Sequence, residues 1–191
     1  QLAQAATGIA DCIKNAGPGI LSAEEVKQVA GKLFTLMDSS LQRTQVEEKL
    51  ADEDKAAAKR ALQHFADDDD DDKDSDTDEE EQLRRNCEEV LGALMQVNCN
   101  EFLPCLEECG RRLSAWISTP HSKVVAMYLG CDLVEHLKEK SEPLWPCLMP
   151  EVFNALGSTD ADARTAAAYC INLAAPLASF SQAAPGAFRR L

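Results

Sequence analysis

Apolar residues recur at intervals of three and four along most of this chain, which is the spacing of one face of an α-helix. The pattern is clearest in two stretches that share a tripeptide, because Pro104-Cys105-Leu106 returns 42 positions later as Pro146-Cys147-Leu148. In each stretch an apolar stripe is followed by a short break and then by a second stripe. The sequence therefore predicts two successive helix-turn-helix units.

Both halves of this unit repeat. Tyr128 and Tyr169 stand 41 positions apart in the second stripes, after breaks at 118–120 and 157–159. Repeats built from two helices span about 40 to 47 residues. We therefore expect an all-α fold, an α-solenoid of antiparallel helix pairs stacked into a superhelix. The stripe positions are Phe102, Leu103, Leu106, Cys109, Leu113, Trp116, Val124, Tyr128, Cys131, Leu137, Leu144, Leu148, Val152, Leu156, Ala166, Tyr169, Cys170, Leu173 and Leu177.

The N-terminal part has its own helix signals. Residues 2–16 predict a helix that Gly17-Pro18-Gly19 ends. Ser22-Ala23-Glu24-Glu25 is a capping box, which starts a second helix. That helix is expected to run through Val29, Leu33, Leu36 and Met37 and past Leu50, with a polar late half that projects into solvent.

These signals divide the chain into a half unit, helix pairs at about 22–97, 100–138 and 143–175, and a terminal fragment, all within one domain spanning 1–191. No stretch approaches the ~20 apolar residues of a membrane span. The chain opens on Gln1 without a signal segment, and the end helices lack a polar cap. We therefore expect a soluble intracellular fragment excised from a longer solenoid, with no membrane insertion.

Composition adds an acidic run. Residues 67–81 hold nine Asp, three Glu and one Lys, a net charge of −11 out of −14 for the chain. Residues 67–78 are therefore expected to form an acidic disordered insert that interrupts one repeat, with a helix resuming near Glu79. The run is either a solvated loop that aids solubility or an electrostatic lure for basic partners. Its sign disfavours nucleic acid as a partner.

The eight cysteines contain no CxxC pair, and most fall on apolar stripes. Reduced cysteine behaves there as a small hydrophobe, so we interpret most of them as buried structural thiols. Cys105 and Cys109 lie one helical turn apart and could gather a metal with Cys99, but no histidine lies nearby in sequence to complete the set.

Other candidate residues also favour structural roles. Trp116 and Trp145 could line pockets for Phe-Gly peptides, but their positions favour core or inter-repeat packing. Asp160 and Arg164 are expected to cap a turn and pair between repeats rather than to form a catalytic dyad. The histidines are scattered without a second ligand at metal spacing, and we interpret them as surface or helix-end residues; they are His64, His121 and His136.

The segment from Asp160 to Tyr169 resembles the HEAT-repeat pattern, in which an acidic residue in the turn precedes an Arg four positions later and then small residues. The helix running into Ala51-Asp52-Glu53-Asp54, the acidic insert, and the segments 83–108 and 143–156 resemble the C-terminal part of an importin-beta superfamily receptor, nearest the karyopherin beta-three (importin five) branch. The turn 118–123 departs from the pattern, because it has neither the Asp nor the Arg.

The resemblance implies a nuclear transport receptor that shuttles between cytoplasm and nucleus. Such receptors bind basic cargo proteins on a concave surface, the GTPase Ran for release, and Phe-Gly nucleoporins between outer helices. No local motif marks those contacts, so no residue is carried over as a site. Catalytic, cofactor-binding and metal residues are not assigned, and no cofactor is expected.

Two other classes were weighed against transport. Phosphate-binding, zinc-hydrolase, serine-hydrolase and dinucleotide motifs are absent from the sequence, so we expect no enzyme. The alternative is a HEAT-repeat scaffold subunit of a stable multiprotein complex. Loss of cargo on adding Ran-GTP would distinguish a transport receptor from a scaffold.

Overall fold

The computed structural model describes residues 2–61 and 74–180. Within those ranges the chain forms helices and no strand, so the all-α prediction is confirmed. The elements are α1 (Leu2–Ala16), α2 (Ala23–Ala61), α3 (Asp74–Val97), α4 (Cys99–Phe102), η2 (Leu103–Cys105), α5 (Leu106–Ile117), α6 (Pro120–Leu137), η3 (Lys138–Leu144), α7 (Trp145–Ala155) and α8 (Ala161–Ala174).

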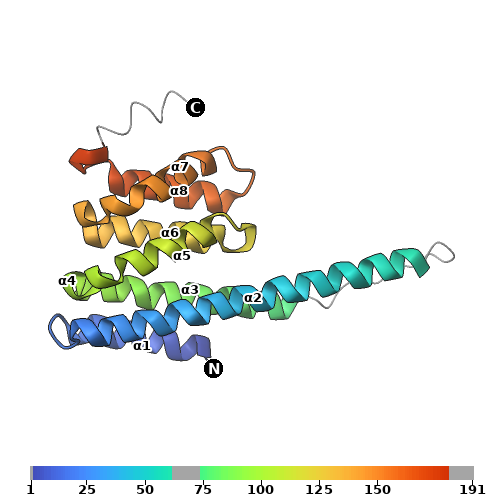
Figure 1. Cartoon of the computed structure of the whole chain (residues 1–191), viewed down its shortest axis with the longest axis horizontal. Coiled ribbons are helices and arrows are strands. Elements are labelled where there is room, and N and C mark those ends of the chain that lie inside the picture. The colour runs from blue at the N-terminus through green and yellow to red at the C-terminus, as the bar shows by residue number, and fades with distance from the viewer. Residues whose placement is uncertain (1, 62–73, 181–191) are drawn as a thin grey trace.

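The helices lie in two layers. Helices α2, α5 and α7 form what we call the first-helix layer, and α1, α3, α6 and α8 form the second-helix layer. Each first helix packs on the helix that follows it, as α2 on α3, α5 on α6 and α7 on α8. Within the second layer α1 contacts α3, α3 contacts α6, and α6 contacts α8. Figure 1 shows the resulting stack of helix pairs.

A continuous apolar core lies between the layers. The largest fully buried side chains include Phe34, Leu91, Phe102, Leu129 and Leu148, so every helix pair contributes to the same core. At about 25 cal/mol per Å² of apolar surface, burial of such side chains is the main term that holds neighbouring pairs together. None of the described helices combines the length and hydropathy needed to span a bilayer.

The turn between α1 and α2 forms as the sequence predicts. Gly17 and Gly19 adopt φ values of 79° and 86°, which glycine accepts without steric cost. The Glu25 amide donates to Ser22 Oγ at 3.3 Å, and the Ser22 amide donates to Glu25 Oε2 at 2.8 Å. This reciprocal pair is the predicted capping box. The Ser22 hydroxyl and the Ser22 amide both donate to Glu25 Oε2, which lowers the pKa of Glu25.

Helix α2 continues well beyond the stack, as Figure 1 shows, because its late half lacks a continuous apolar stripe to hold it against the other helices. Helix α3 then begins at Asp74 rather than near Glu79. An acidic segment is compatible with a helix start, since acidic residues are favoured in the first turn. Residues 67–73 of the expected insert lie outside the described residues.

Two residues assigned to apolar faces from the sequence are exposed instead. Leu36 and Tyr169 have exposed fractions of 36% and 42%. Each lies at the edge of the apolar face of its helix, where a small rotation of the helix moves a side chain out of the interface. The Tyr169 ring therefore belongs to the surface of the second-helix layer, and this position decides its role below.

Candidate functional site

The surface of the second-helix layer carries a polar cluster that links three successive helix pairs. We call it the α6 cluster: it comprises Asp132, Glu135 and His136 on α6, Glu88 on α3 and Tyr169 on α8. The three α6 residues occupy positions i, i+3 and i+4, which fall on one face of a helix. The contacts between α3, α6 and α8 bring the other two residues to that face.

Glu88 and Asp132 form a carboxyl pair at the α3–α6 contact. Burial raises the pKa of Glu88 strongly, and the neighbouring Asp132 raises it further. Burial also raises the pKa of Asp132, while the hydrogen bond from Glu88 opposes that shift. Two carboxylates so close cannot both ionise easily, so Glu88 keeps its proton and donates a hydrogen bond to Asp132.

A glycine makes this close approach possible. A Cβ atom at Gly92 would lie 2.2 Å from Asp132 Oδ2, well inside van der Waals contact. Any larger residue at this position would force the Asp132 side chain or α3 to shift. The absence of a side chain at Gly92 therefore shapes the cluster.

Glu135 and Tyr169 are the exposed members of the cluster, whereas Asp132 and His136 are partly buried. The Tyr169 hydroxyl donates to Glu135 Oε2 at 2.9 Å, which ties α8 to α6 and raises the pKa of Tyr169 to about 12. His136 Nε2 lies 4.0 Å from Asp132 Oδ1. The arrangement presents carboxylate oxygens and one imidazole on a single patch, which suits basic side chains or a cation.

Ionised groups surround the cluster. Lys14 Nζ pairs with Glu89 at 3.2 Å, and Arg85 pairs with Glu81 at 2.6 Å. Arg85 also lies within electrostatic reach of Asp162. Carboxylates outnumber basic groups on this face, so its potential is negative.

The first-helix layer has a different kind of surface. A small cavity of about 130 Å³ lies between α2 and the η2–α5 segment, and its apolar lining includes Ala30, Phe34 and Pro104. The same cavity is bordered by Lys27 and Glu108. Along α2 an open groove of about 680 Å³ continues past Thr35 and Leu36. We call these two hollows together the α2 groove.

Charged residues fix the two helices that border the α2 groove. Asp38 accepts from Arg112 Nη1 and, at 2.8 Å, from Trp116 Nε1. The Arg112 guanidinium also lies 5.3 Å from the Phe34 ring centroid, a cation–π contact. The α2–α5 spacing is therefore set by a network rather than by apolar packing alone.

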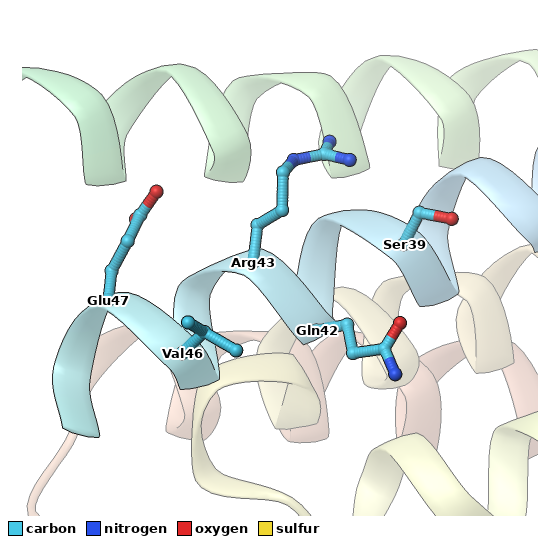
Figure 2. A pocket seen from close by; sticks show the side chains of 5 residues that line it. All are labelled: Ser39, Gln42, Arg43, Val46 and Glu47. Carbon is cyan, nitrogen blue, oxygen red and sulfur yellow. The ribbon is translucent and has the colours of Figure 1, made fainter. Parts of the chain in front are cut away.

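A third hollow of about 340 Å³ lies further along α2, where the helix leaves the stack. Figure 2 shows Arg43 and Glu47 pointing toward α3, and Gln42 and Val46 on other sides of the helix. Arg43 Nε donates to Glu80 Oε1 at 2.7 Å, which lowers the pKa of Glu80. The rest of the lining consists of Ser39, Gln42, Glu47 and the half-exposed Val46.

The tryptophans lie where the sequence predicts. Trp116 and Trp145 are 4% and 7% exposed, so both are core residues. Asp160 caps α8 by accepting from the Asp162 amide at 2.9 Å. The Arg164 guanidinium donates to the Ser158 and Thr159 carbonyls rather than to the Asp160 carboxylate, so it closes the turn, and the expected pairing between repeats is not formed by these two residues.

The cysteines are structural where they are buried. Burial raises the pKa of Cys87 to about 11 and that of Cys109 to about 12, so both remain neutral thiols. Cys12, in contrast, is exposed. Cys99, Cys105 and Cys109 do not bring their sulfur atoms together as a metal set among the described residues.

The histidine interpretation needs one correction. His136 was expected to stand apart from other ligands, but it lies beside Asp132 and Glu135. Sequence spacing alone could have found these neighbours, because i, i+3 and i+4 share a helix face, whereas Glu88 and Tyr169 join only through tertiary contacts. His64 and the side chain of His121 lie outside the described residues.

Part of the chain matches a known protein family. The family described as Importin repeat 6 matches residues 1–117, which cover α1 to α5. No curated protein matches the chain.

Proposed function

The chain belongs to the importin-beta family, and on that premise we propose that it is a HEAT-repeat segment of a receptor that carries basic proteins into the nucleus. The observation that supports this most directly is the importin repeat match over more than half of the chain. The karyopherin beta-three branch is our finer assignment. A receptor of this kind works in both cytoplasm and nucleus.

The α6 cluster is the proposed contact for basic cargo. Asp132 and Glu135 present carboxylate oxygens that can accept from Lys or Arg, and such charge-assisted bonds are about twice as strong as neutral ones. The surrounding carboxylates give the face a negative potential that attracts basic chains from a distance. The exposed Tyr169 ring adds an aromatic surface for the aliphatic part of a Lys or Arg side chain.

The α2 groove is the proposed contact for Phe-Gly nucleoporins. Its lining of Ala30, Phe34 and Pro104 is apolar, and its place between two neighbouring first helices fits a phenylalanine side chain inserted between repeats. Ran-GTP would release the cargo, as the family resemblance implies. We assign no residue of this chain to Ran.

The cargo proposal is tested with the full-length receptor and a fluorescent basic peptide. The variant Glu135→Gln with Glu89→Gln removes two carboxylates of the face, and Glu139→Gln, on η3, is the matched control. Exposed charge pairs contribute about 0.2–1 kcal/mol each, so binding should weaken by about two- to thirtyfold for the double variant and stay unchanged for the control. Equal affinities for all three proteins would remove the α6 cluster from the cargo site.

Ran-GTP provides the test between transport and scaffold functions. Cargo bound to the wild-type receptor should dissociate when Ran-GTP is added, and Ran-GDP serves as the control. Cargo that stays bound with Ran-GTP would favour the alternative of a HEAT-repeat scaffold in a stable complex.

The groove proposal has its own test. Gly31→Leu places a side chain over the α2 groove, where a Cβ meets nothing within 4 Å, and Gly8→Leu makes the same change in open space on α1. A Phe-Gly peptide should bind more weakly to the Gly31 variant only. Unchanged binding by both variants would place the nucleoporin contact elsewhere.

A further inference from the structure

One group of metal-type ligands stands together in the described part of the chain. A ligand atom from each of Asp132, Glu135 and His136 lies within 4.8 Å of the other two. The three side chains come from adjacent turns of one helix, so a rigid element positions all of them. Tetrahedral ligands at metal–ligand distances of about 2.0–2.2 Å stand a little over 3 Å apart. Small side-chain rotations therefore suffice to close the set.

From this geometry we propose that Asp132, Glu135 and His136 bind a divalent first-row cation, Zn²⁺ foremost. The mixture of one imidazole with carboxylates matches the ligands that zinc accepts in proteins. A purely acidic surface patch would instead suit magnesium or calcium, which prefer oxygen ligands. The imidazole thus determines the class of cation.

The surroundings support a positioned site rather than a chance meeting of charges. Tyr169 donates to Glu135 Oε2, which holds this carboxylate against α8 in the way that outer hydrogen bonds orient metal ligands. Glu88 reaches Asp132 from α3, and Gly92 gives Asp132 the room to stay there. A cation here would be held by α6, with Glu88 of α3 and Tyr169 of α8 as hydrogen-bond partners of its ligands.

The test uses the full-length protein, freed of metal with a chelator and titrated with Zn²⁺ by calorimetry. The variant His136→Gln removes the imidazole, and Glu139→Gln is the control. Wild type and Glu139→Gln should each bind one more Zn²⁺ ion per molecule than His136→Gln. Equal stoichiometry and affinity for wild type and His136→Gln would overturn the proposal. Equal melting temperatures of the metal-free proteins would show that the variant is folded.

Two further readouts separate this site from cysteine binding. Co²⁺ at the α6 cluster should give visible d–d bands without the sulfur-to-cobalt charge-transfer band that thiolate ligands produce. Tyr169→Phe keeps the ring and removes only the hydroxyl, so it should weaken Zn²⁺ binding by roughly tenfold or more, as loss of an outer-shell partner does. A sulfur-to-cobalt charge-transfer band, with Co²⁺ binding unchanged in His136→Gln, would contradict the assignment. Full Zn²⁺ affinity in Tyr169→Phe would also contradict it.

Discussion

Glu88 is a carboxylic acid held neutral inside a polar cluster. Its burial and its contact with Asp132 both disfavour ionisation, so the folded protein retains a proton that the unfolded chain releases above its ordinary pKa of 4.5. The group therefore favours folding most at low pH. As pH rises from the unfolded pKa toward the higher folded pKa, that contribution is lost.

The variant Glu88→Gln should remove this pH dependence. Glutamine retains the N–H that can donate to Asp132 but carries no ionisable group. The melting temperature of the variant should therefore rise relative to wild type between about pH 5 and about pH 8, with the difference growing as pH increases. Thermal unfolding followed by circular dichroism at several pH values measures this. A constant difference across the range would mean that Glu88 ionises normally.

Lys138 is the residue with the most unfavourable backbone conformation. It ends α6 with φ 52° and ψ −126°, and it is the described non-glycine residue with positive φ. Its carbonyl accepts from Ser141 Oγ at 2.6 Å, which helps to hold the turn into η3. A side chain in this region costs on the order of 1–3 kcal/mol.

Lys138→Gly should therefore stabilise the protein by about 1 kcal/mol, because glycine adopts this conformation freely but loses more entropy on folding. Urea unfolding compares the variant with wild type. Glu139→Gly, at the next position, lacks the positive φ and should be neutral or destabilising. If both glycine variants lower stability equally, the turn is not strained at Lys138.

At the scale of helices, packing against α6 depends on glycines that let neighbouring helices approach. A Cβ at Gly130 would lie 2.5 Å from a Leu148 methyl group, and one at Gly92 would lie 2.2 Å from Asp132. Gly130 brings α6 toward α7, and Gly92 brings α3 toward α6. Spacing between helix pairs is thus set by small residues at single positions.

Gly92→Ala should destabilise the protein by roughly 1–3 kcal/mol, because the added methyl group forces Asp132 or α3 to shift. Gly8→Ala is the matched control, since a Cβ there meets nothing within 4 Å. The control should be stabilised by about 0.5–1 kcal/mol, the usual gain of alanine over glycine in a helix. Denaturant unfolding of both variants gives the comparison. Stabilisation of both proteins would show that α3 and α6 have room to separate.

For the whole molecule, charge is distributed unevenly along the chain. Residues 67–81 carry −11 of the formal charge of −14, and the six aspartates at 67–72 supply more than half of that run. Glu80 and Glu81 are also structural, because they pair with Arg43 and Arg85. Neutralising only the aspartates at 67–72 therefore tests the effect of long-range charge and leaves the ion pairs of Glu80 and Glu81 in place.

Replacing the aspartates at 67–72 with Ser and Asn should slow association with basic cargo at low salt and leave dissociation nearly unchanged. The difference should shrink as salt rises, because exposed charges are screened beyond about 10 Å at 0.1 M. Association rates on immobilised cargo, measured across a salt series with the full-length receptor, test this. Equal rates at low salt would reduce the run to an aid to solubility.

Local features were predictable because their causes lie within a few residues. The glycines at 17 and 19, the capping box at Ser22, the N-cap at Asp160 and the stripes that bury Trp116 depend on neighbours in sequence. The repeat of Pro-Cys-Leu indicated stacked pairs because equal spacing places equal faces against one another. Fold class and helix boundaries follow from such short-range constraints.

The α6 cluster, in contrast, was decided by tertiary structure. Glu88, Asp132 and Tyr169 belong to three helices, and their distance from one another depends on how those helices pack. Periodicity placed Tyr169 on an apolar stripe, whereas packing left it at the margin and gave its hydroxyl to Glu135. The sequence by itself determined the all-α fold, most of the buried stripes, and the turn and capping box between α1 and α2. Interhelical distances, which no local pattern encodes, decided which polar side chains meet. They also decided which carboxyl group keeps its proton.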